Sequence, residues 1–208
     1  MLTVENIEVT GWEAAIRGMR NPMNSWSKSD SGYVDGAYLL GPADLGLMNR
    51  LYGAGPEHRK YLRMIIVTMD ITAPLYWWKE FDTYKVGTVA NSCSTMHKIH
   101  AKKFEWNDFS HEHLTGEVSY EAFKKLIEAL NFHRDMFIDT KDKNYWWNMI
   151  QLLPSSYNQK RTVQLSYENA VTIIKQRTGH KLDEWNYLVH ILVDLPYLNE
   201  IVTGGVQM

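Results

Sequence analysis

The stretch APLYWWKEFDTYKVGTVANSCSTMHK, residues 73–98, decides how the rest of the sequence is interpreted. It follows the apolar and β-branched run RMIIVTMDIT, whose composition predicts a buried strand from Arg63 to Thr72. Pro74 is typical of the start of a helix, so we expect the strand to lead into the helix LYWWKEFDTY. The hydroxyl, amide and basic side chains that follow predict a polar loop, which either holds a ligand or only forms a turn.

Outside this stretch, hydrophobic periodicity predicts two more strands and six more helices. We expect Ser119 to cap one helix, because the apolar residues from Phe123 to Leu130 recur at helical spacing. Two polar segments, residues 21–41 and 97–114, are expected to be irregular. The other predicted strands cover residues 2–10 and 161–167, and the helices begin near residues 11, 47, 119, 143, 168 and 183.

The order of these elements predicts an α+β protein, in which helices pack against a small mixed or antiparallel sheet. A chain of 208 residues buries a sizeable core, and we find no internal repeat and no linker. We therefore expect a single domain over residues 1–208.

The composition excludes several classes of function. No stretch approaches the roughly 20 apolar residues that cross a bilayer, so we expect no membrane partner. A net charge of -2 gives no broad attraction for nucleic acid. Glu5 and Glu8 stand where a signal peptide carries basic residues, and a single cysteine, Cys93, suits a reducing compartment. A cytoplasmic location is therefore expected.

The aromatic content is high, with eight Trp and twelve Tyr residues. Two pairs, Trp77–Trp78 and Trp146–Trp147, are adjacent in predicted helices, where neighbouring side chains point about 100° apart. We expect one member of each pair to face another subunit or a ligand. A Trp-rich core is the alternative, and packing is the main role expected of Trp77 and Trp78.

Residues 71–98 resemble the core of the flavin-dependent thymidylate synthases, whose helix begins after Ala-Pro and leads into a loop of the form RHRxxSxNExSxRY. With one inserted residue near Val89 or Ala90, the RHR places fall on Thr83, Tyr84 and Lys85. The Ser, Asn, Glu and Ser places of the loop fall on four polar residues: Thr88, Asn91, Ser92 and Ser94. The final Arg and Tyr places fall on Met96 and His97, which differ from the family. Downstream, residues 152–185 resemble a second region of the family, in which a Leu-Pro pair is followed by a strand, a helix, an arginine and a tryptophan.

The resemblance implies site residues by position. Arg177 falls on the catalytic arginine that holds the pyrimidine base, and His58 lies sixteen residues before Pro74, the spacing of a histidine that contacts the flavin. The other cofactor-binding residues implied are Thr83, Tyr84, Lys85, Asn91 and Ser166, and the substrate-binding residues are Glu80, Ser92, Ser94 and Arg177.

These residue types suit the chemistry, but each also has an ordinary structural explanation. The planar fork of Arg177 can pair with a carbonyl oxygen of a pyrimidine, or it can only complement the helix dipole. Lys85 can pair with a flavin phosphate, or it can be a solvated surface lysine. Asn91 and Ser94 can bind a ligand, but both are common in turns. Tyr84 can stack on a flavin or adenine ring.

The phosphate-binding positions of the family are not kept. The residues that bind the phosphate of dUMP in the family are replaced here by Glu80, Met96 and Ile150. A carboxylate repels phosphate, and neither Met nor Ile replaces a charge-assisted pair worth roughly 1.5–3 kcal/mol. The departures argue against dUMP itself and favour a phosphate-free acceptor, unless another basic residue compensates: Lys79, His97, Lys98 or Arg161.

Two other kinds of site are disfavoured. A metal site would use ligands from a His-rich segment that matches no standard zinc pattern: His97, His100, Asp108, His111, Glu112 and His113. Cys93 is a possible nucleophile, but no general base lies beside it in the sequence. We therefore expect no metal and no catalytic cysteine.

The resemblance implies an FAD-dependent methyltransferase that converts dUMP, or a related pyrimidine, to its 5-methyl product. Methylenetetrahydrofolate would supply the one-carbon unit and NADPH the electrons, and the family forms homotetramers. Whether this chain is an enzyme stays open at this point. One alternative is a flavin- or nucleotide-binding homologue that has lost synthase activity and acts as a binding or regulatory protein. Another is a protein that keeps only the scaffold.

Overall fold

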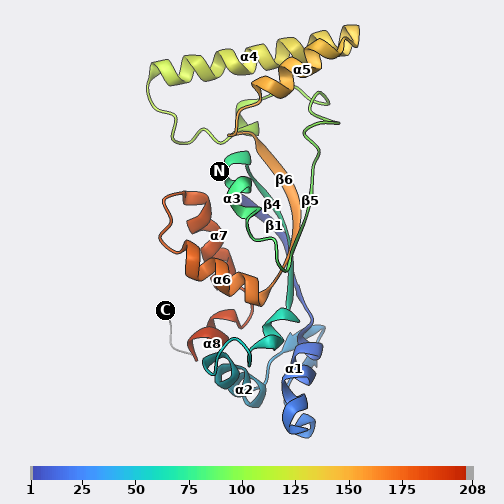
Figure 1. The fold of residues 1–208 in the computed structure, drawn as a ribbon, viewed down its shortest axis with the longest axis vertical. Helices are drawn as coiled ribbons and strands as arrows, with labels where there is room; N and C mark the ends of the chain where they lie inside the picture. The colour runs from blue at the N-terminus through green and yellow to red at the C-terminus, as the bar shows by residue number, and fades with distance from the viewer. Residues whose placement is uncertain (1, 205–208) are drawn as a thin grey trace. The chain divides into compact units, whose positions relative to one another are not determined.

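The computed structural model describes residues 2–204 (Figure 1). These residues form two compact units, and each unit is assembled from separate segments of the chain. Within the described range, unit 1 comprises residues 2–3, 70–83 and 91–162, and unit 2 comprises residues 4–69, 84–90 and 163–204. The single domain expected over residues 1–208 stays a prediction.

The fold class is α+β, as expected, with a small antiparallel sheet. Four strands form the sheet in the order β1-β4-β6-β5. Burial of Val67, Met69 and Ile71 explains why the apolar run on β4 forms an inner strand. The three predicted strands are confirmed with shifted ends, whereas β5 was not predicted. The strands are β1 (Thr3–Thr10), β4 (Ile66–Pro74), β5 (Thr88–Ser92) and β6 (Asn158–Ser166).

Unit 1 contains three helices, two of which, α4 and α5, lie side by side (Figure 1). Phe123, Ile127 and Leu130 of α4 pack with Met149 of α5 in one hydrophobic cluster. The predicted cap at Ser119 is wrong, because α4 already begins at Glu117, directly after Gly116. The helices are α3 (Leu75–Phe81), α4 (Glu117–Thr140) and α5 (Lys143–Leu152), with a 3-10 turn, η4 (Trp106–Asp108).

Both tryptophans of α3 are buried. Trp77 is 0% and Trp78 is 1% exposed, and both rings contact Phe81. The indole Nε1 of Trp78 donates a hydrogen bond to the carbonyl oxygen of Gln159 at 2.9 Å. The packing role expected of both residues is confirmed, and the expectation that one of them faces a ligand or another subunit is wrong. In the second pair, Trp147 is 44% exposed.

Unit 2 holds the remaining helices. In it α6 packs against α7, and α2 packs against α8. Tyr167 begins α6, and its hydroxyl donates to the carbonyl oxygen of Pro196 at 2.7 Å. Trp185 and Leu188 of α7 are fully buried, as the predicted apolar stripe requires. The helices are α1 (Trp12–Arg20), α2 (Pro42–Gly53), α6 (Tyr167–Arg177), α7 (Asp183–Val193) and α8 (Leu198–Thr203), and α8 was not predicted.

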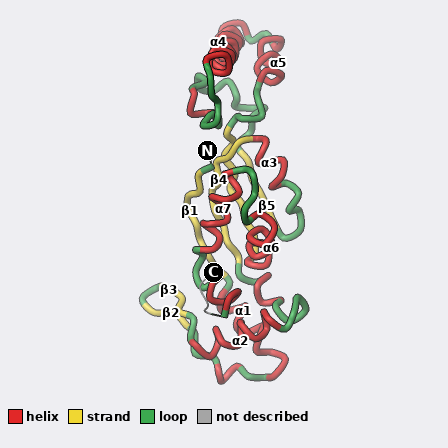
Figure 2. The backbone as a smooth tube through the Cα atoms, turned by 90° about the vertical axis from the view of Figure 1, so that its left-hand side faces the viewer, coloured by secondary structure: helices red, strands yellow, loops and turns green. Residues whose placement is uncertain are grey.

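Residues 21–41 were expected to be irregular, but they contain a hairpin. Strands β2 (Gly32–Val34) and β3 (Ala37–Leu39) pair antiparallel, as Figure 2 shows. Asp35 and Gly36 connect them with positive φ angles of 50° and 83°. Both central residues therefore have the sign of φ that a tight hairpin turn requires. Three short 3-10 turns complete unit 2: η1 (Asn21–Met23), η2 (Trp26–Lys28) and η3 (Lys60–Arg63).

A buried carboxylate fixes the chain before this hairpin. Asp44 is 0% exposed and pairs with Nε of Arg20 at 2.6 Å. Its other oxygen accepts hydrogen bonds from the hydroxyl groups of Ser29 and Ser31, at 2.8 and 2.7 Å. The charge is therefore matched and hydrogen-bonded, as a buried ion pair requires.

Among residues 2–204, no helix is both long enough and apolar enough to cross a membrane.

Candidate functional site

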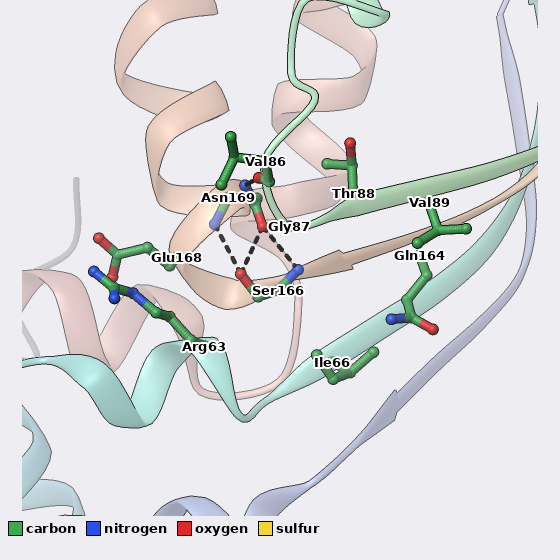
Figure 3. A pocket seen from close by; sticks show the side chains of 10 residues that line it. All are labelled: Arg63, Ile66, Val86, Gly87, Thr88, Val89, Gln164, Ser166, Glu168 and Asn169. Carbon is green, nitrogen blue, oxygen red and sulfur yellow. Dashed lines mark hydrogen bonds between the residues drawn. The ribbon is translucent and has the colours of Figure 1, made fainter.

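A pocket of about 650 Å³ lies within unit 2, a volume within the usual range for small-molecule sites. The loop at residues 86–89, the end of β6 and the start of α6 surround it (Figure 3). Ten residues line it: Arg63, Ile66, Val86, Gly87, Thr88, Val89, Gln164, Ser166, Glu168 and Asn169.

One asparagine joins the helix to the loop. Asn169 and Ser166 form a capping box at the start of α6, in which the side-chain oxygen of each accepts from the backbone N–H of the other, at 3.2 and 3.3 Å. The side-chain oxygen of Asn169 also accepts from the Ser166 hydroxyl at 2.7 Å. The Asn169 amide nitrogen donates to the carbonyl oxygen of Val86 at 2.8 Å. Both ends of this side chain are therefore used to hold the pocket wall, so Asn169 positions the loop.

The loop also depends on a glycine. Gly87 has a φ of +78°, in the region that side chains other than that of glycine rarely adopt. A Cβ atom there would lie 2.8 Å from the side-chain oxygen of Asn169. The close approach of loop and helix therefore requires Gly87.

The polar side chains of the pocket differ in how they are satisfied. Glu168 accepts two hydrogen bonds from Arg59, at 3.2 and 3.0 Å. Arg63 and Gln164 make no side-chain hydrogen bond or ion pair with any residue between 2 and 204. Val86 and Val89 add exposed apolar surface. The pocket thus offers a cation and a carboxamide to a ligand beside apolar walls.

Arg177 lies in a second cluster of unit 2. Its Nε donates to the hydroxyl oxygen of Tyr84 at 2.9 Å, and its Nη1 lies 3.2 Å from Nε2 of His180. The guanidinium carbon is 4.3 Å from the centre of the Trp185 ring, within reach of a cation–π contact. The Tyr84 hydroxyl in turn donates to Gln176 at 2.9 Å. The arginine expected to hold the pyrimidine is therefore fixed in orientation by its own unit.

The other residues predicted in unit 2 fall at different places. Ser166 lines the 650 Å³ pocket and is buried. His58 lies at a different pocket, of about 440 Å³, 3.8 Å from the carboxylate of Glu57. Lys85 is exposed. The structure therefore brings Tyr84 to Arg177 and places Ser166 and His58 at two separate pockets.

The remaining predicted residues belong to unit 1. Glu80 is half-buried on α3, and its carbonyl oxygen accepts from the Thr83 hydroxyl at 2.7 Å. Ser94 accepts hydrogen bonds from the backbone N–H groups of residues 96 and 97, at 3.2 and 3.0 Å, which is the geometry of a turn. Two further predicted residues are exposed at the end of β5: Asn91 and Ser92.

The residues of the two disfavoured sites lie in unit 1. Within residues 2–204, no group of three or more His, Cys, Asp or Glu side chains is placed to hold a metal ion. Cys93 is exposed, and its backbone N–H donates to the carbonyl oxygen of Lys160 at 2.9 Å. In the His-rich segment, Nδ1 of His111 lies 2.9 Å from the carbonyl oxygen of Phe109.

Sequence reasoning missed four residues that shape the pocket: Arg63, Gly87, Gln164 and Asn169. The spacing of Ser166 and Asn169 is that of a capping box, so this signal was present in the sequence. Arg63 and Gln164 carry no such signal, because only the tertiary fold brings the end of η3 beside β6.

No protein-family model matches this chain, and no curated protein matches it. Solved structures do match it. The flavin-dependent thymidylate synthase ThyX of Helicobacter pylori, complexed with FAD and dUMP, aligns with a TM-score of 0.68 and 17% identity over 98% of this chain and 100% of its own. A second structure of ThyX from Helicobacter pylori with FAD and dUMP gives a TM-score of 0.66 and 18% identity over 97% of both chains.

The UMP/dUMP methylase PolB of Streptomyces cacaoi, bound with 5-Br dUMP, gives a TM-score of 0.69 and 13% identity over 98% of this chain and 95% of its own. Identities this low show the fold alone. The chain has the fold of the flavin-dependent thymidylate synthases.

Proposed function

We propose that this protein binds FAD and a pyrimidine deoxynucleotide and catalyses the FAD-dependent methylation of the pyrimidine. The observation that carries the proposal is the fold match over nearly the whole length of both chains. The matched structures contain FAD and dUMP in two cases and 5-Br dUMP in the third. The reaction proposed is the conversion of dUMP, or a related uracil compound, to its 5-methyl product.

The 650 Å³ pocket fits part of a flavin. Val86 and Val89 provide apolar surface for a planar ring, and Gln164 provides a free carboxamide for its polar edge. Arg63 provides a positive charge, which a flavin phosphate requires. Gly87 keeps the backbone of the loop free of a side chain at the pocket wall. We therefore propose these residues, with Ser166, as a flavin-binding site within unit 2.

FAD would supply the hydride chemistry, and the chain would bind and orient the reactants. Arg177 would present its guanidinium to a carbonyl oxygen of the pyrimidine and stabilise negative charge that develops there. Tyr84 and His180 would keep that guanidinium in one orientation. Methylenetetrahydrofolate as one-carbon donor, NADPH as reductant, a homotetramer and a cytoplasmic location belong to the same proposal.

A second candidate is a flavin- or nucleotide-binding homologue without synthase activity. Two observations favour it. Arg177 already has partners within its own unit, so a substrate must compete with them or share the guanidinium. Glu80, Met96 and Ile150 stand at the positions that the resemblance assigns to phosphate contacts, and none of the three is a cation. Weak binding of dUMP would then leave a flavin protein with another role.

The test is the visible absorption spectrum of the purified protein with and without added FAD, followed by tritium release from dUMP labelled at C5. The release assay contains NADPH and methylenetetrahydrofolate. A flavin spectrum with tritium release supports the synthase, and a flavin spectrum without release supports the binding protein or another acceptor. A protein that binds no flavin rejects the synthase and the flavin-binding homologue.

A further inference from the structure

Two side chains in the 650 Å³ pocket have free polar ends. The side chains of Arg63 and Gln164 make no hydrogen bond or ion pair with another residue of the described chain, 2–204. The other polar side chains bond within the protein, since Asn169 bonds to Val86 and Ser166, and Glu168 pairs with Arg59 through Oε1, while its Oε2 is buried without a hydrogen-bond partner. A ligand in this pocket therefore finds two unused recognition groups, one charged and one neutral.

The charge of the pocket lining points to an anion. Glu168 is the only carboxylate among the lining residues, and Arg59 balances its charge by donating two hydrogen bonds to Oε1. Arg63 is the only cation among the lining residues, and no second carboxylate of the lining balances its charge. A guanidinium pairs with phosphate through two parallel hydrogen bonds, which makes phosphate a suitable partner.

The carboxamide of Gln164 points to a second group. A glutamine side chain carries one acceptor oxygen and two N–H donors side by side. An imide edge, in which an N–H stands beside a carbonyl group, is complementary to this arrangement. Uracil and the pyrimidine ring of flavin both have such an edge. The exposed apolar surface of Val86 and Val89 lies along the same pocket and suits a planar ring.

We propose that Arg63 and Gln164 are the specificity-determining residues of this pocket, and that they select a ligand with both a phosphate group and an imide edge. Arg63 pairs with the phosphate, and Gln164 bonds to the imide. The inference rests on the proposed function and deepens it, because it names Arg63 as the residue that distinguishes a flavin nucleotide from free riboflavin and Gln164 as the residue that recognises the ring. Uracil nucleotides share both groups, so the experiment includes them.

Titration calorimetry on the full chain tests this with five ligands: riboflavin, FMN, FAD, deoxyuridine and dUMP. The wild-type protein is expected to bind FMN about 10- to 100-fold more tightly than riboflavin, the range for one charge-assisted pair. Arg63→Gln is expected to remove this preference and leave riboflavin affinity unchanged. Gln164→Leu is expected to weaken riboflavin and FMN alike, by about fivefold to tenfold.

Arg50→Gln is the matched control, because it removes the same charge from an exposed residue of α2 that does not line the pocket. Circular dichroism confirms that the variants fold, which we expect because the side chains of Arg63 and Gln164 are both exposed.

The outcomes separate the inference from the proposed function. If the wild-type protein binds flavin and Arg63→Gln keeps the full preference for FMN, the inference is overturned and the proposed function stands. If Arg63→Gln lowers only the preference for dUMP over deoxyuridine, the phosphate on Arg63 belongs to the nucleotide, and the inference holds for that ligand. If the wild-type protein binds none of the five, both are overturned.

Discussion

The Nε atom of Arg177 donates a hydrogen bond to the hydroxyl oxygen of Tyr84, 93 residues earlier in the chain, at 2.9 Å. The same guanidinium stacks on Trp185, so three segments of unit 2 meet at one side chain. This arrangement limits Arg177 to few orientations. An arginine that is fixed before a ligand arrives loses little freedom on binding, which favours recognition of a planar base.

Arg177→Lys keeps the charge but removes both the Nε donor and the planar group over Trp185. We expect the free energy of unfolding to fall by about 1–2 kcal/mol. Urea denaturation measures this, with Arg17→Lys on the exposed face of α1 as the control. Equal unfolding midpoints for the two variants would show that the cluster does not stabilise unit 2.

Gly87→Ala tests the contact between the pocket loop and Asn169. Gly36 also has a positive φ, but an added Cβ there meets no atom within 4 Å. Gly36→Ala therefore measures backbone strain alone, expected at about 1 kcal/mol. Gly87→Ala adds a close contact, so we expect a larger loss of unfolding free energy, by at least about 1 kcal/mol more.

Thermal unfolding of the two variants gives the comparison, and flavin titration shows whether the loop still forms the pocket wall. We expect Gly87→Ala to weaken flavin binding and Gly36→Ala to leave it unchanged. The reverse order of stability would contradict the geometry of the loop.

Asp44→Asn tests the buried ion pair. The substitution leaves Arg20 as a buried charge without a counter-ion, and we expect a loss of about 3–5 kcal/mol in unfolding free energy. Arg59 and Glu168 form a more exposed pair in the same unit, so Glu168→Gln serves as the control and should cost less. A loss below that of the control would contradict the prediction.

The same carboxylate makes stability depend on pH. Burial alone raises the pKa of Asp44, but hydrogen bonds from Ser31, Ser29 and Arg20 together hold that pKa below its ordinary value. Because the pKa of Asp44 is lower in the folded state than in the unfolded state, its ionised form stabilises the fold. This stabilisation is complete above the pKa of Asp44 in the unfolded chain, about 3.9, and it is lost as the pH falls through the pKa of Asp44 in the folded protein. Urea unfolding between neutral and acidic pH should show a smaller acid-induced loss in Asp44→Asn than in the wild type.

Trp78→Phe tests the buried helix α3. The substitution removes the donor to the Gln159 carbonyl oxygen and leaves unfilled space in a closed core. We expect a loss of about 2–4 kcal/mol in unfolding free energy. Trp147→Phe is the control, since Trp147 is 44% exposed on α5, and it should change stability by less than about 1 kcal/mol. Similar losses for both variants would contradict the difference in burial.

The sequence predicted the strongly periodic elements of the fold and missed short ones: β2, β3, β5 and α8. The apolar run of β4 and the stripe on α7 carry a strong signal because burial determines their pattern. Strand β5, with the sequence TVANS, has mostly exposed side chains, so pairing with the sheet determines its structure. The hairpin was predictable, because Asp35–Gly36 is a favourable turn sequence.

The candidate site was less predictable than the fold. The resemblance led to Tyr84, Ser166 and Arg177, whose roles in binding stay predictions. It gave no indication of Arg63 or Gln164, because their importance comes from the absence of partners in the folded chain. The opening stretch itself is divided between a buried helix and an exposed loop, since Trp77 is fully buried and Asn91 is exposed.

The interleaving of the two units has a consequence for synthesis in the cell. Unit 2 needs residues 4–69 together with residues 163–204, and unit 1 needs residues 91–162. During translation, the helices α1 and α2 emerge long before α6, whose Tyr167 contacts Trp12 of α1, and α8, which packs against α2. Contacts of such high sequence separation slow folding. The nascent chain therefore exposes apolar surface until its later segments emerge, and this surface must be kept from aggregating. We expect folding of this chain in the cell to depend on chaperones.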